Sequence, residues 1–290
     1  MKFFDRLKKT SEKNCSFLCI GLDPVLDRIP ESLLKEKDPL FEFNKAIIDA
    51  TADKACAYKP NAAFFEQYGL KGMEALQKTI DYIPDSVPVI LDCKRGDIGY
   101  TAGAYARAAF EELKADAVTV NPLLGKDSLD PFIEYEDKGV FVLGLTSNQG
   151  SEDFQKMNVE VSGAGCQVSA SASPKPETRN LKPLFLVIAE KVKQWDKNNN
   201  CGLVVGATNN DELRAIRECV PDMWFLIPGI GAQGGDLAAV MQNAVSSKSE
   251  PRILINASRS ILYASDGQDF ANAAGKVASE LIDSINSFVL

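Results

Sequence analysis

The chain has 290 residues, of which 45% are hydrophobic and 25% charged, proportions that are usual for a soluble globular protein. With 40 acidic and 32 basic residues it carries a formal net charge of −8, which argues against nucleic acid or an anionic membrane as its main partner. It contains no histidine, and this excludes Ser–His–Asp and Cys–His catalytic sites and every His-ligated zinc site.

Short apolar runs rich in Val, Ile and Phe recur along the chain, and each predicts a β-strand. They are nearly continuous rather than alternating, which is typical of parallel strands covered on both faces. The eight predicted strands are Phe17–Asp23, Ala55–Lys59, Pro88–Lys94, Ala117–Asn121, Gly139–Thr146, Gly202–Thr208, Trp224–Gly229 and Arg252–Ser258.

Helical patterns separate these runs. One begins at Asp38 and Pro39, an N-cap residue followed by a proline in the first turn. Others begin near Leu184, at Asn210 and at about Asp269, each with apolar residues at helical spacing. Eight alternating β and α units predict one (β/α)8 TIM barrel domain over residues 1–290.

The alternative fold is an open, doubly wound sheet. A dinucleotide-binding sheet of that kind would carry GxGxxG after its first strand, where this chain has Gly21-Leu22-Asp23-Pro24. A further stretch at about 157–183 is rich in Ser and Pro and has no aromatic residue. We expect a mobile surface insertion there, either a disordered loop or a lid.

The number and spacing of the cysteines indicate the cellular compartment to expect. There are seven, an odd number, and none forms a CxxC pair, which indicates reduced and mostly buried thiols. The N-terminus is charged, and no apolar run of 18 residues occurs. We therefore expect a cytoplasmic protein without a signal peptide or membrane span.

Charged side chains collect where the predicted strands end, which is the catalytic face of a barrel. Alternation along the third strand points Asp92 and Lys94 into the barrel, and Asp97 follows in a turn from which it can reach the same place. Asp23 and Lys59 end the first two strands and should converge there. A structural ion pair is the other interpretation of Asp92 and Lys94, but charges converging from three strands favour a functional site.

An anion site is predicted after strands seven and eight. The glycine-rich run 228–235, with Gln233 and Gly234, offers backbone N–H groups after the seventh strand. Arg259 follows the eighth strand and can hold a phosphate with two hydrogen bonds. The loops after strands seven and eight are the usual phosphate site of this fold.

With these residues in view, the chain resembles the orotidine 5′-phosphate decarboxylase family, most closely its longer bacterial subgroup. The family signature D-x-K-x-x-D-I stands here as 92–98, followed by Gly99-Tyr100-Thr101. Further matches over about residues 17–262 include 21–24, 58–61, 119–122, 146–148, 205–208, 228–236 and 257–259. The stretch 157–183 is longer and richer in Ser and Pro than the resemblance leads us to expect.

The resemblance implies decarboxylation of orotidine 5′-monophosphate to uridine 5′-monophosphate in pyrimidine biosynthesis, with no cofactor and no metal. It implies catalytic roles for Lys59, Asp92, Lys94 and Asp97, with Lys94 protonating C6. Asp23 and Lys59 would bind the ribose, Ser147 the pyrimidine, and Gln233, Gly234 and Arg259 the phosphate. It also implies a homodimer in which Asp97 and Thr101 reach the neighbour's site.

Two alternatives stay open at the level of sequence. Magnesium-dependent sugar-phosphate lyases of the same superfamily share D-x-K-x-x-D, but the resemblance places a Glu ligand at the end of their second strand, where this chain has Lys59. The other alternative is a non-catalytic nucleotide-binding barrel. A Schiff-base aldolase would need Lys94 with a lowered pKa, and adjacent carboxylates oppose that.

Overall fold

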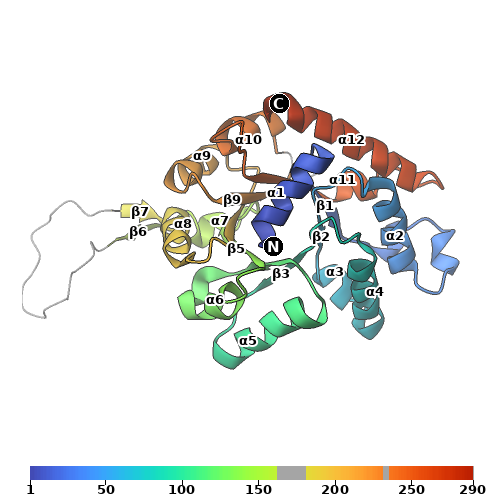
Figure 1. Ribbon diagram of the computed structural model, residues 1–290, viewed down its shortest axis with the longest axis horizontal. Coiled ribbons are helices and arrows are strands. Elements are labelled where there is room, and N and C mark those ends of the chain that lie inside the picture. The colour runs from blue at the N-terminus through green and yellow to red at the C-terminus, as the bar shows by residue number, and fades with distance from the viewer. Residues whose placement is uncertain (162–180, 231–234, 290) are drawn as a thin grey trace, which may run out of the picture.

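The computed structural model describes residues 1–161, 181–230 and 235–289 of the chain. Eight parallel strands lie side by side in the order β2-β1-β10-β9-β8-β5-β4-β3, and bridges from Tyr58 to Val89 and from Asn61 to Asp92 join β2 to β3. Helices surround this barrel (Figure 1). The barrel strands are Leu18–Leu22 (β1), Ala57–Pro60 (β2), Ile90–Arg95 (β3), Ala117–Val120 (β4), Gly139–Leu145 (β5), Cys201–Val205 (β8), Trp224–Pro228 (β9) and Ile253–Ala257 (β10).

Each barrel strand overlaps one predicted run, so the (β/α)8 prediction is confirmed. The α-helices are Phe3–Asn14 (α1), Pro39–Thr51 (α2), Ala63–Glu66 (α3), Gly69–Tyr82 (α4), Gly99–Arg107 (α5), Lys126–Ile133 (α6), Ser151–Phe154 (α7), Leu184–Trp195 (α8), Asn210–Cys219 (α9), Leu237–Ala244 (α10), Arg259–Leu262 (α11) and Phe270–Val289 (α12). The four short helical turns are Leu26–Arg28 (η1), Leu33–Lys35 (η2), Ala108–Glu112 (η3) and Pro122–Leu124 (η4).

The strands are buried on both faces, as their continuous apolar sequences require. Outward side chains pack under the helices, and inward ones such as Ile90 and Phe141 form a second core inside the barrel. Helix α1, which the sequence analysis did not identify, lies across the barrel (Figure 1) and adds Phe3 and Phe4 to this inner core. Phe4 stacks on Trp224 at 5.8 Å between ring centroids. The end of the barrel beneath α1 is therefore apolar.

The predicted insertion at 157–183 differs from expectation at both of its ends. Asn158–Glu160 (β6) and Leu181–Pro183 (β7) pair as a two-stranded antiparallel ribbon. The base of the ribbon is closed by two further hydrogen bonds, in which Leu184 N–H donates to the Met157 carbonyl and Phe185 N–H to the Gln155 carbonyl, both at 2.9 Å. The part of the insertion at 162–180 lies outside the described residues.

In the described part of the chain, no helix is both long and apolar enough to cross a membrane. The six cysteines found there are free thiols, and Cys19, Cys56 and Cys201 are buried.

Candidate active site

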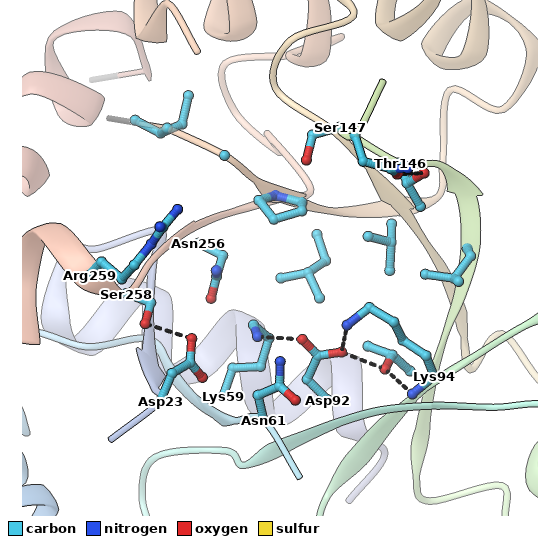
Figure 2. A pocket seen from close by; sticks show the side chains of 18 of the residues that line it. Asp23, Lys59, Asn61, Asp92, Lys94, Thr146, Ser147, Asn256, Ser258 and Arg259 are labelled. Carbon is cyan, nitrogen blue, oxygen red and sulfur yellow. Dashed lines mark hydrogen bonds and ion pairs between the residues drawn. The ribbon is translucent and has the colours of Figure 1, made fainter. Parts of the chain in front are cut away.

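A cavity of about 450 Å³ opens at the carboxyl ends of the strands, a size that suits a small-molecule ligand. Its floor is apolar and includes Leu143, Val204 and Leu226. Its walls carry polar side chains from six of the strand ends (Figure 2), namely Asp23, Lys59, Asn61, Asp92, Lys94, Thr119, Thr146, Ser147, Asn148, Asn256, Ser258, Arg259 and Ser260.

The carboxylate of Asp92 lies at the centre of the charged wall. Its Oδ2 accepts a hydrogen bond from Lys59 Nζ at 2.7 Å, and its Oδ1 accepts one from Lys94 Nζ at 2.6 Å. The Asp92 side chain is 10% exposed and that of Lys59 is 5% exposed, whereas that of Lys94 is 48% exposed. Asp92 therefore joins a buried cation to one that faces the open cavity.

Asp92 and Lys59 each stabilise the charged form of the other. Burial opposes ionisation of Asp92, but the ammonium groups of Lys59 and Lys94 hold its pKa well below the usual range. Burial would likewise lower the pKa of Lys59, and the carboxylates of Asp92 and Asp23 raise it above its ordinary value instead. At neutral pH, both side chains of the buried pair are charged.

The backbone of β3 changes course at Lys94. Lys94 has a φ of 46°, in the left-handed region, and the register with β4 shifts between Leu91 and Arg95. Simple alternation predicts the side of the strand on which Lys94 lies, but it does not predict this irregularity. Backbone strain of this kind collects at functional sites, because the surrounding structure must hold it in place.

Thr119 of β4 supplies that support, and the sequence analysis missed it. Its hydroxyl accepts hydrogen bonds from the backbone N–H groups of Cys93 and Lys94, at 3.1 and 2.9 Å. It donates its own proton to Asp92 Oδ1 at 2.8 Å. The only signal was a hydroxyl residue in the otherwise apolar strand 117–120, where a buried polar group needs a partner.

Asp23 lines the cavity on the other side of Lys59. Ser258 donates a hydrogen bond from Oγ to Asp23 Oδ2 at 2.6 Å. This contact requires glycine at position 21, because a Cβ there would lie 2.6 Å from Ser258 Cβ. Asp23 is therefore held by the neighbouring strand end, as Figure 2 shows.

The loop after β5 brings Ser147 to the cavity wall (Figure 2). Gln155 fixes this loop by accepting a hydrogen bond from Thr146 N–H at 2.8 Å. Gly206 permits its close approach to β8, because a Cβ at that position would lie 2.6 Å from Ser147 N. The predicted pyrimidine-binding residue is thus placed by the base of the insertion and by a neighbouring strand.

The predicted anion site is partly described. Arg259 begins α11 and lines the cavity together with Gly229 and Ile230. Gln233 and Gly234 lie outside the described residues.

Two of the predicted site residues, Asp97 and Thr101, do not line the cavity of their own chain. The sequence analysis expected that Asp97 can reach the same place as Lys94. Within this chain Asp97 is not among the lining residues, and its part in a site stays a prediction. Asp97 accepts a hydrogen bond from the N–H of Ile98 at 2.8 Å. Thr101 is exposed on α5 and also lies outside the lining.

The thiols near the site are not candidate nucleophiles. Burial raises the pKa of Cys19 to about 12 and that of Cys93 to about 11, so both are protonated at neutral pH. Cys93 packs outward against the core, as expected. Across residues 1–161, 181–230 and 235–289, no group of three or more Cys, Asp and Glu side chains is arranged to hold a metal ion.

Comparison with known proteins points to one family. The model of the orotidine 5′-phosphate decarboxylase / HUMPS family matches residues 16–274. The chain is 46% identical over 288 residues to orotidine 5′-phosphate decarboxylase of Dehalococcoides mccartyi, covering 99% of this chain and 98% of that protein. Among solved structures, OMP decarboxylase of Leishmania donovani matches with a TM-score of 0.79, 39% identity and 99% coverage of both chains. UMP synthase of the same organism matches at 41% identity and a TM-score of 0.83, covering 99% of this chain but 56% of the longer one.

The first prediction concerns the shared carboxylate. Asp92→Asn leaves the Lys59 ammonium buried without its counter-ion, so we expect the free energy of unfolding in urea to fall by about 3–5 kcal/mol. The matched control is Asp130→Asn, which breaks the exposed pair with Lys126 and should cost no more than about 1 kcal/mol.

The same variant has an expected pH dependence. Because the pKa of Asp92 is lowered by folding, its stabilisation is present above the pKa of an unfolded aspartate, about 3.9, and is lost as the pH falls below it. The difference in stability between wild type and Asp92→Asn should therefore narrow below pH ~4. A variant as stable as wild type at pH 7 would contradict the account of the pair.

Proposed function

The chain belongs to the orotidine 5′-phosphate decarboxylase / HUMPS family, and we propose that its cavity converts orotidine 5′-monophosphate to uridine 5′-monophosphate and carbon dioxide, a step of pyrimidine biosynthesis. The observation that carries this proposal is the array Lys59–Asp92–Lys94 at the mouth of the barrel. It offers a cation whose position is fixed and whose ammonium group faces the cavity.

The chemical step needs positive charge and then a proton at one carbon atom. When the bond between C6 and the carboxylate carbon breaks, its electron pair stays on C6 and carbon dioxide leaves. The Lys94 ammonium group stabilises that carbanion and then donates a proton to C6, and water restores the proton on Nζ. No redox step or carbonyl adduct is involved.

Preorganisation is the main contribution that the protein makes to this step. Asp92 and the Thr119 hydroxyl fix Lys94 before substrate binds, so little reorganisation is needed as charge develops on C6. A carboxylate close to the substrate's own carboxylate adds repulsion that carbon dioxide loss relieves.

Different residues bind the three parts of the nucleotide. Asp23 and Lys59 bind ribose hydroxyls, Ser147 the pyrimidine, and Arg259 the phosphate, with Gln233 and Gly234 as further phosphate ligands. Binding energy from the distant phosphate then serves to align C6 with Lys94.

We further propose a cytoplasmic homodimer with shared active sites. The turn after Asp97 and the first residues of α5 expose apolar side chains, with Tyr100 99% and Ile98 58% exposed. A two-fold partner could cover this turn and receive Asp97 and Thr101 in its own site. The net charge of −8 does not favour nucleic acid as a partner.

Catalysis should proceed without an added metal. By the resemblance, the end of the second strand is where a magnesium-dependent lyase of this superfamily would need a carboxylate ligand, and this chain has the buried ammonium group of Lys59 there. Purified protein should consume orotidine 5′-monophosphate, followed by its ultraviolet absorbance, and should do so after exhaustive dialysis against EDTA. Activity that is lost on dialysis and restored by magnesium would favour the lyase alternative, and binding without turnover would favour a non-catalytic protein.

Lys94→Ala should abolish turnover while leaving the fold intact. Loss of a general acid costs about 10²–10⁴-fold, and more is expected because the charged residues act as a unit. Lys126→Ala is the matched control, since Lys126 is 45% exposed and also paired with an aspartate, but lies outside the cavity. A Lys94→Ala protein with near-normal kcat would remove this lysine from the mechanism.

Arg259→Ala should act through the phosphate. Loss of charge-assisted hydrogen bonds should raise KM for the monophosphate roughly 10- to 100-fold. Residual turnover of the unphosphorylated nucleoside should be unchanged, because it has no phosphate to hold. Arg214→Ala, at an exposed arginine on α9, serves as control. Equal losses on both substrates would place Arg259 outside the phosphate site.

Mixing two inactive variants tests the shared site. Lys94→Ala and Asp97→Ala homodimers should each be nearly inactive. Refolding them together yields heterodimers in which one site carries both changes and the other carries neither, so random pairing restores roughly one site in four. No recovery of activity would show that Asp97 serves its own chain or no site at all.

A further inference from the structure

Asn256 is a polar residue on the inner face of β10, and neither the charge array nor the anion site uses it. It lines the cavity beside an apolar floor, and only 8% of its surface is exposed. Its Oδ1 is buried and has no hydrogen-bond partner among the described residues. A buried acceptor without a partner costs free energy, so a ligand that supplies a donor is favoured at this point.

A second acceptor without a partner lies on the neighbouring strand end. Asp23 uses Oδ2 to accept the hydrogen bond of Ser258, while its Oδ1 is buried and accepts no hydrogen bond from the described residues. β1 and β10 are adjacent, with Cys19 aligned with Asn256. Figure 2 shows Asn256 in the cavity beside Ser258 and Arg259, with Asp23, which is hydrogen-bonded to Ser258, and Lys59 close by.

The same part of the cavity also contains donor capacity. Lys59 Nζ carries three protons, and the described residues provide one hydrogen bond for it, to Asp92 Oδ2. Acceptors and donors are therefore both available around this space. A phosphate or carboxylate only accepts hydrogen bonds at neutral pH, so it cannot satisfy Asn256 Oδ1. A hydroxyl group both donates and accepts, and it would satisfy the amide in either of its two orientations.

We propose that Asn256 is a further substrate-binding residue, whose side-chain amide hydrogen-bonds a sugar hydroxyl of the bound nucleotide and so contributes to selectivity for ribose over deoxyribose. The proposal rests on the proposed function in that its ligand is a nucleoside monophosphate. It assigns the amide to the sugar, between the phosphate held by Arg259 and the base held near Ser147.

The experiment measures binding of the product and of two analogues. Uridine 5′-monophosphate and its 2′-deoxy and 3′-deoxy forms are titrated by calorimetry into wild type and Asn256→Leu, which removes both polar atoms at similar volume. We expect wild type to prefer the full ribose, and Asn256→Leu to lose about 3- to 10-fold of that preference for one of the two hydroxyls, the worth of one hydrogen bond.

Asn44→Leu is the matched control. Asn44 is also buried with Oδ1 unpartnered, but it lies on α2 beside Thr79 and away from the cavity. This change should alter thermal stability and leave the hydroxyl preference at its wild-type value. Asn256→Asp keeps an acceptor at the site and should retain the preference, which covers the case in which Asn256→Leu does not fold.

The outcomes separate this inference from the proposed function. A preference for ribose that is unchanged in Asn256→Leu, or lost equally in Asn44→Leu, overturns the role of Asn256, as does a wild type without any hydroxyl preference. If Asn256→Leu is unfolded, loss of the preference in Asn256→Asp overturns it. Failure of wild type to decarboxylate orotidine 5′-monophosphate overturns the function instead, while an Asn256-dependent preference would still support the sugar contact.

Discussion

The Asp92 carboxylate carries a buried negative charge that two lysines share, and the geometry of the site depends on this contact. A buried charge is tolerated only where its attraction and its hydrogen bonds compensate for lost hydration. Both oxygens of Asp92 are used, Oδ1 by Lys94 and Thr119 and Oδ2 by Lys59. Since these partners come from three adjacent strands, the charge array also ties β2, β3 and β4 together at the barrel mouth.

The two ends of the barrel differ in polarity, and this difference favours the contact between Asp92 and its two lysines. Toward the amino ends of the strands, aromatic side chains and helix α1 fill the interior. Toward the carboxyl ends, Leu143, Val204 and Leu226 form a floor beneath the charged side chains. An apolar floor strengthens the electrostatic interactions above it, because water cannot screen them from below. The same core therefore stabilises the fold and increases the effect of the charges on a bound ligand.

Much of the fold could be predicted from sequence because each barrel strand is buried on both faces. That burial produces the continuous apolar runs, and the polar residue that ends each run marks the barrel mouth, as for Asp23, Lys59 and Asp92. Helix α1 was not predicted because only Phe3, Phe4 and Leu7 of its 12 residues are apolar, too few to form an apolar face at helical spacing. The ribbon β6–β7 was not predicted because its strands have only three residues each and lie in a stretch whose composition is typical of loops.

The candidate site was less predictable where one contact depends on another. The left-handed backbone of Lys94 is fixed by the Thr119 hydroxyl on the next strand, and a pattern along β3 alone cannot indicate it. Nor can such a pattern show that Ser258 holds Asp23 across the gap left by glycine at position 21. Asp97 adds a different limit, since its proximity to Lys94 in the sequence does not bring it into the lining of this chain's cavity.

The polar atoms of the cavity fall into two groups, and the distinction explains how one pocket can both bind and react. Asp92 is saturated with partners within the described chain, so it acts as a fixed source of field that substrate does not rearrange. Asp23 and Asn256 each retain a buried acceptor that finds no partner among the described residues, so they gain most when a ligand arrives. Lys94 belongs to both groups, because its ammonium group is held by Asp92 and yet remains half exposed to the cavity. That double position is what a residue needs if it is to stabilise charge on a bound carbon atom and then give that atom a proton.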